Sequence, residues 1–179
     1  MTHDKISILG ISGSLRLNSS ASNVLHIVSG LFPAHVDFII YKGIEHIPAF
    51  NDSEAIPPAV RDFIQSVYKA DAVFFCIPEY AFGVPGALKN ALDWTVSSTA
   101  FSDKPTALIT AASSGDKAHA ALLLTLTALG AKIPDSTRLL LPFIRTRLTG
   151  NGEIKDAGTL LKIRNQCQAL MEIIQTGNK

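Results

Sequence analysis

The stretch ISILGISGSLRLNSSASN, residues 6–23, runs from an apolar strand through a glycine- and serine-rich loop into a helix. A second stretch of the same kind, PEYAFGVPGALKNALDW at residues 78–94, follows another apolar run. In open parallel sheets, ligands bind outside the carboxyl ends of the strands, near the point where the connections change face. We therefore expect the two loops to lie together and to form one site.

Short apolar runs alternate with helical patterns along the whole chain. Nearly continuous apolar residues, typical of strands covered on both faces, predict strands at 6–11, 36–41, 72–77, 106–110 and 138–141. Apolar residues at helical spacing lie between and after these runs, around Val24, Val60, Leu88, Leu122 and Ile163. Five such units predict an α/β fold: a doubly wound five-stranded parallel sheet with helices on both faces.

Composition limits the class of protein. The chain has 179 residues, 47% of them hydrophobic, and no linker divides it, so we expect a single domain over 1–179. Its net charge is +1 and the basic residues are scattered, which argues against nucleic-acid binding. We see no apolar run near the roughly 18 residues of a membrane span and no signal peptide, so we expect a cytoplasmic protein. Cys76 and Cys167 do not make a disulfide framework.

The first loop is suited to an anion. Gly10 and Gly13 provide a tight turn, and a helix N-terminus favours negative charge. Arg16 can make a charge-assisted contact to a phosphate, and further donors are Ser12, Ser14, Ser19, Ser20, Ser22 and Asn23. The alternative is a turn that only caps the next helix, with Ser20 or Ser22 as N-cap. The loop matches neither the nucleoside triphosphate nor the GxGxxG pattern.

The second loop is suited to a flat ring. Pro78 ends the preceding strand, which leaves unpaired backbone groups, and Tyr80 and Phe82 can cover a heteroaromatic ligand. Taken alone, both aromatics also fit ordinary half-buried loop positions. In the helix that follows, we interpret Trp94 as a packing or subunit-contact residue and assign a solvated face to Lys89, Asn90 and Asp93.

The two loops together resemble the NAD(P)H-dependent FMN reductase family, which has a flavodoxin-like fold and includes quinone and chromate reductases. GSLR at 13–16 is similar to the family's phosphate loop, and PEY followed by PGALKNALDW is similar to its isoalloxazine loop. The resemblance continues through TAASSGDKAHAALLLTLTALGAKIP and RLTGNGEIKDAGTLLKI, so it covers most of the chain.

The resemblance implies a set of cofactor-binding residues. The FMN phosphate would be held by Ser14, Arg16, Ser20 or Ser22, and Asn23. The flavin ring would be contacted, largely through the backbone, by Pro78, Glu79, Tyr80, Ala81 and Phe82, and approached from the next strand by Ser113, Ser114 and Gly115. The chain departs from the family at three points: Arg16 and Asn23 are seven apart instead of the usual five, Ala81 replaces a frequent asparagine, and the third loop has a single glycine.

These residues predict an FMN-dependent oxidoreductase. It would take hydride from NADH or NADPH and pass electrons to a quinone, a flavin or a similar small acceptor by a ping-pong mechanism. No side chain need act as a catalytic acid or base, because the cofactor supplies the chemistry. The alternatives are a flavodoxin-type electron carrier, disfavoured by the charge of +1 and by GSLR, and a non-catalytic flavin-binding subunit.

Metal binding and assembly complete the expectations. No metal is expected, because His3, His26, His35, His46 and His119 lack ligand spacing. A homodimer or homotetramer is expected, because the apolar side chains at 78–94 exceed what one solvent-facing loop needs; they are Tyr80, Phe82, Val84 and Trp94.

Overall fold

Five parallel strands form one sheet in the order β2-β1-β3-β4-β5. The computed structural model describes residues 5–16, 18–52 and 54–177. The strands are β1 (Ile6–Ser12), β2 (Val36–Ile40), β3 (Ala72–Ile77), β4 (Thr106–Ala111) and β5 (Arg138–Leu141). This strand order is the flavodoxin-like one, in which the connections change face between β1 and β3. The predicted fold class is confirmed, and each strand lies within one residue of its predicted bounds.

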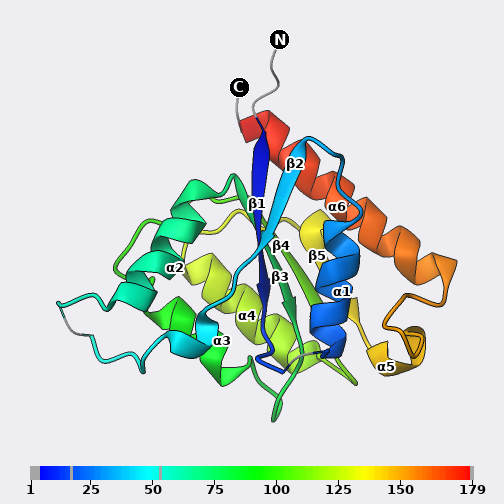
Figure 1. The fold of residues 1–179 in the computed structure, drawn as a ribbon, viewed down its shortest axis with the longest axis horizontal. Coiled ribbons are helices and arrows are strands. Elements are labelled where there is room, and N and C mark those ends of the chain that lie inside the picture. Colours follow the sequence, from blue (N-terminus) through cyan, green and yellow to red (C-terminus); the bar gives the residue numbers. More distant parts are fainter. Residues whose placement is uncertain (1–4, 17, 53, 178–179) are drawn as a thin grey trace.

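Helices cover both faces of the sheet (Figure 1). The long helices are α1 (Ser20–Ser29), α2 (Pro58–Lys69), α3 (Gly86–Asp93), α4 (Asp116–Ala128) and α6 (Ala157–Gly177). Three short elements were not predicted, because they are too short to show a helical period: η1 (Ile44–His46), η2 (Asp135–Thr137) and α5 (Ile144–Arg147). Among the described helices, none is both long and apolar enough to cross a bilayer.

The alternation of side chains along β3 separates two cores. Val73, Phe75 and Ile77 face the core beneath α2, α3 and α4. Ala72, Phe74 and Cys76 face the core beneath α1 and α6. All six residues are fully buried, as expected for the central strand of a sheet covered on both sides. This packing fixes the strand ends, and with them the loops at the lower edge of the sheet in Figure 1.

The ends of β1 and β3 approach each other closely at Gly13. Its N–H donates to the carbonyl of Cys76 at 2.9 Å. A Cβ at position 13 would lie 2.7 Å from Ile77 Cγ2 and 3.2 Å from Ile77 Cα, so no larger residue fits without moving the strand. Glycine at this position therefore brings the loops after β1 and β3 together.

Candidate functional site

Four segments meet at the carboxyl edge of the sheet around a pocket of about 100 Å³. We call it the central pocket. Its lining comes from the loop after β1, the loop after β3, the loop after β4 and the start of α5, namely Arg16, Ser19–Ala21, Pro78–Tyr80, Ala111–Ser113, Ile144 and Arg145. The expectation that the first two loops form one site is therefore correct in its geometry, and the loop after β4 joins them.

Ser19 begins helix α1. Its backbone is extended, and its side chain accepts a hydrogen bond from the Ser22 N–H at 3.1 Å. The expectation that Ser20 or Ser22 is the N-cap is therefore wrong, because the helix begins earlier than either alternative assumed. Ser20 and Ala21 are instead the first two helical residues, and their N–H groups have no acceptor within the helix. Both residues line the central pocket.

The other predicted phosphate residues are held by contacts within the protein. Ser22 Oγ lies 2.8 Å from Ser19 Oγ and 3.1 Å from Ser12 Oγ. Ser14 is only 7% exposed, and its Oγ is 3.1 Å from the Tyr80 hydroxyl, which joins the first loop to the second. Asn23 packs against Gly152, where an added Cβ would lie 2.6 Å from its Nδ2.

A second pocket lies on the other side of the first loop and has a volume of about 170 Å³. We call it the outer pocket. Ser14, Ser22 and Asn23 line it, whereas Ser20 lines only the central pocket. Arg16 borders both pockets. The structure thus divides the predicted phosphate residues into two groups with Arg16 between them.

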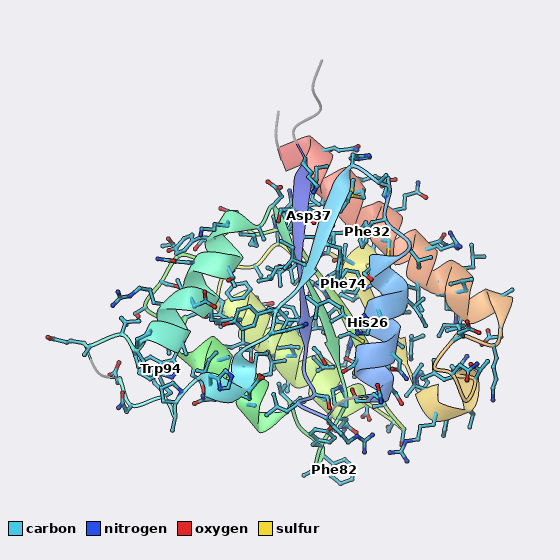
Figure 2. All side chains as sticks on the ribbon, viewed as in Figure 1. His26, Phe32, Asp37, Phe74, Phe82 and Trp94 are labelled. Carbon is cyan, nitrogen blue, oxygen red and sulfur yellow. The ribbon has the colours of Figure 1, made fainter. Side chains whose placement is uncertain are left out.

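The second loop contains a two-residue hairpin turn. Tyr80 and Gly83 exchange backbone hydrogen bonds of 3.1 and 2.9 Å, and the residues between them are left-handed, with φ of 48° at Ala81 and 58° at Phe82. Such turns favour asparagine and glycine, because left-handed backbone costs other residues about 1–2 kcal/mol each. The turn directs Phe82 away from the protein, 79% exposed (Figure 2).

Glu79 connects the second loop to the third. One carboxylate oxygen accepts from the Gly115 N–H at 3.2 Å, and the other accepts from the Ala118 N–H at 2.9 Å. Both N–H groups belong to the start of α4, which lacks helical acceptors there. The Glu79 side chain therefore caps α4 and positions the third loop.

The three predicted residues of the third loop have different surroundings. Ser113 is exposed and lines the central pocket. The Ser114 hydroxyl donates to Asp116 Oδ1 at 2.8 Å, and this bond, together with Lys117, lowers the pKa of the Asp116 carboxyl. Gly115 has a φ of 95° and leaves no room for a Cβ against Leu140 and Thr110. Only Ser113 therefore offers a free side chain to the pocket.

On α3, the expected solvated face is wrong for Asn90, whereas Trp94, just after the helix, has the packing role that was one of its two predicted roles. Asn90 is half-buried and does not lie on a solvated face: its amide donates to the Pro48 carbonyl at 2.9 Å and accepts from the Phe50 N–H at 2.8 Å. Trp94 is only 3% exposed, donates to the same Pro48 carbonyl at 2.8 Å and meets Phe50 edge-on. Trp94 is therefore a packing residue within this chain (Figure 2). Lys89 and Asp93 do form a surface ion pair of 2.6 Å.

Arg145 is the charged residue of the central pocket that the sequence did not predict. It lies on α5, which is a single turn and therefore too short to show a periodic pattern in the sequence. The preceding residue, Phe143, is two before Arg145 and has a left-handed backbone with a φ of 55°. One available signal was topological: any residue just after the last parallel strand lies at the same edge of the sheet as the other loops.

Other reactive groups lie outside this site. No cluster of three His, Cys, Asp or Glu residues suited to a metal occurs in the part of the chain that the structure describes, and His3 lies outside that part. Burial raises the pKa of the Cys76 thiol and raises that of Cys167 to about 12, so both remain protonated. His119 is half-buried, and its Nδ1 lies 2.9 Å from Thr110 Oγ1.

A family model and curated relatives indicate one family, and solved structures share its fold. Residues 6–144 match the family model for NADPH-dependent FMN reductase. An NAD(P)H-dependent FMN reductase of Pseudomonas aeruginosa is 34% identical over 93% of this chain and 94% of its own length. A quinone reductase of Escherichia coli is 28% identical over 96% of this chain and 97% of its own length. Among solved structures, the flavoenzyme NAD(P)H:(acceptor) oxidoreductase FerB of Paracoccus denitrificans superposes with a TM-score of 0.81, at 22% identity, over 96% of this chain and 98% of FerB.

Replacing Glu79 by alanine should loosen the third loop. Loss of both carboxylate bonds to the start of α4 should lower the free energy of unfolding by about 0.5–2 kcal/mol, the range for loss of a helix cap. Urea denaturation measures this change, and faster amide exchange at Gly115 and Ala118 would locate it. The control is Glu153→Ala, because the Glu153 side chain is exposed and its carboxylate makes no hydrogen bond within the described residues. Equal stability of the two variants would contradict the capping role.

Proposed function

We propose that this chain, which belongs to the NADPH-dependent FMN reductase family, passes electrons from NAD(P)H through FMN to a quinone, a free flavin or a similar small acceptor. It is an oxidoreductase that uses FMN as cofactor and NADH or NADPH as donor. The acceptor, the kinetic scheme and the roles of individual residues are the proposed part. The observation that carries them is the central pocket, where the start of α1, Arg16 and the loops after β3 and β4 converge.

The residues around the central pocket fit the phosphate end of FMN. A phosphate monoester carries about −1.5 to −2 charge at neutral pH. Arg16 supplies a full positive charge, and the N–H groups of Ser20 and Ala21, which lack helical acceptors, add the partial positive charge of a helix start. A pocket of about 100 Å³ takes a phosphate group and is well below the roughly 300–1,000 Å³ of sites that enclose drug-sized ligands. The ring would therefore lie over the mouth of the pocket.

The loops at that mouth fit a flat ring. Pro78 and Glu79 provide backbone, Tyr80 and Phe82 provide exposed aromatic surface, and Ser113 provides a free hydroxyl on the facing loop. The Glu79 carboxylate already accepts two N–H groups, so it would hold the loops and not the ring directly. We propose that Ala81 acts through the turn that it forms, because its side chain is a single methyl group.

The role of the protein is then to bind, orient and expose the cofactor. When bound, FMN supplies the two-electron chemistry that links a hydride donor to an electron acceptor. Arg16 and the start of α1 would anchor the phosphate, the backbone after β3 would align the ring, and Tyr80, Phe82 and Ser113 would frame one open face. No carboxylate or imidazole lies free at this mouth among the described pocket residues, so no side chain is assigned as a general acid or base.

Two other functions are less well supported. A flavodoxin-type electron carrier would bind the same cofactor, but the net charge of +1 lacks the acidity that such carriers use for docking. A non-catalytic flavin-binding subunit would retain FMN without reacting with a nicotinamide. Rapid bleaching of bound FMN by NADH or NADPH supports the reductase and excludes both alternatives.

A cytoplasmic location remains a prediction, supported by the two unpaired thiols.

Arg16→Ala should weaken FMN binding by about 10- to 150-fold, because a charge-assisted hydrogen bond contributes roughly 1.5–3 kcal/mol. Riboflavin, which has no phosphate, should bind the variant and the wild-type protein equally. Titration followed by flavin fluorescence measures both affinities. Equal losses for FMN and riboflavin would show that Arg16 does not bind the phosphate.

NAD(P)H and the acceptor should react by a ping-pong scheme. The described loops frame one open mouth, and the sequence has no GxGxxG turn to hold a dinucleotide separately, so donor and acceptor should alternate over the same ring face. Initial rates at several fixed quinone concentrations should give parallel double-reciprocal lines, with inhibition by quinone at high concentration. Intersecting lines would mean that both substrates bind together and would overturn the shared face.

We further propose a homodimer or homotetramer in which the loop after β3 lies near the subunit contact. Phe82 and Tyr80 are exposed there, and aromatic residues are enriched at interfaces. Trp94 packs inside the chain and is not part of this exposed surface. Sedimentation velocity at micromolar concentration should show a species of at least twice the chain mass of 19.2 kDa. A single species of monomer mass would contradict the proposal.

A further inference from the structure

Two arginines border the central pocket from loops that are far apart in the sequence. Arg16 follows β1, and Arg145 follows β5, which lies three places along the sheet. Neither guanidinium group makes a hydrogen bond or ion pair within the described residues. Two unpaired cations beside one small pocket favour an anion there, although the whole chain carries only +1.

Two arginines near Arg145 in the sequence do have partners within the protein. Arg147, two residues away, donates to the Pro142 carbonyl at 3.0 Å and to the Thr159 hydroxyl at 2.9 Å. Arg138 donates to the Ile133 carbonyl and pairs with Asp135 at 2.8 Å. These two side chains fasten the protein to itself. Arg145 has no such role, and it is the one of the three that lines the pocket.

The backbone that carries Arg145 is fixed relative to the third loop. Phe143 donates to the Ser113 carbonyl and Ile144 donates to the Ala112 carbonyl, both at 3.1 Å. The Ile144 side chain is 2% exposed and anchors α5 in the core beneath α1 and α6. A long flexible side chain therefore extends from a rigid base at the wall of the central pocket.

We propose that Arg145 is a second phosphate-binding residue, which holds the FMN 5′-phosphate together with Arg16 and the start of α1. This inference rests on the proposed function, because it takes FMN as the ligand. Arg16 and a helix start supply about +1.5 charge, and a second guanidinium raises this to about +2.5, enough to balance a phosphate dianion. Glu79 is the one acidic residue among the described lining residues, and both its oxygens already accept N–H groups.

Three variants test the assignment: Arg145→Gln, Arg145→Lys and the control Arg164→Gln. Arg164 is an exposed arginine on α6, and its replacement changes the net charge equally without touching the central pocket. FMN release on dilution of the holoprotein, followed by fluorescence, gives the dissociation constant. Arg145→Gln should raise it by about 10-fold, Arg145→Lys by less, and Arg164→Gln not measurably. Riboflavin affinity should be the same in all four proteins.

Each other outcome contradicts the assignment. Unchanged FMN affinity in Arg145→Gln, with a large loss in Asn23→Ala, would mean that the phosphate occupies the outer pocket. Equal losses for FMN and riboflavin would mean that Arg145 acts on the ring or on folding. A raised KM for NADPH but not for NADH, with FMN affinity unchanged, would assign the arginine to the donor's phosphate. Failure of the wild-type protein to bind FMN would overturn the proposed function itself, which separates the two failures.

Discussion

The close approach of β1 and β3 at Gly13 is the constraint on which the site depends. The Gly13 N–H binds the Cys76 carbonyl, and its Cα hydrogen occupies space that a Cβ would share with Ile77. Because the connections change face between these two strands, their loops leave the sheet in opposite directions and open a crevice between them. A longer distance here would separate Arg16 from Pro78 and divide the central pocket. The fold supplies the crevice, and one glycine makes it narrow.

Polar links between loops then hold the crevice in shape. The Ser14 and Tyr80 hydroxyls join the first loop to the second, Glu79 joins the second to the third, and Phe143 joins the third to α5. Each link satisfies backbone or hydroxyl groups that strand and helix ends leave unpaired. The loops are thus ordered by one another and need little apolar packing. Such preorganisation lowers the entropy that binding a cofactor would otherwise lose.

The sequence predicted the elements well and the individual contacts less well. Apolar periodicity records burial, so β3 and the long helices are recovered from it directly. A contact such as that of Asn90 with the 48–50 segment leaves no periodic signal, because it depends on a loop that lies 40–42 residues earlier in the chain. The serines of the first loop show the same limit. Spacing identified a polar loop at a helix start, but whether Ser19, Ser20 or Ser22 caps the helix depends on which of them has the last extended backbone before the helix.

The turn at Ala81 and Phe82 shows why the conformation of the second loop was the hardest to predict from the sequence. Two consecutive left-handed residues without glycine or asparagine oppose local preference, and propensity alone would place the turn elsewhere. Three contacts outweigh that preference: two backbone bonds between Tyr80 and Gly83, and the hydrogen bond between the hydroxyls of Tyr80 and buried Ser14. The strain is therefore balanced by a link that also shapes the first loop. Strained backbone of this kind concentrates at ligand sites. There, the functional gain from placing a side chain correctly outweighs the loss of stability that the strained backbone causes. Here the presented side chain is Phe82, at the mouth of the pocket that Arg16 and Arg145 border.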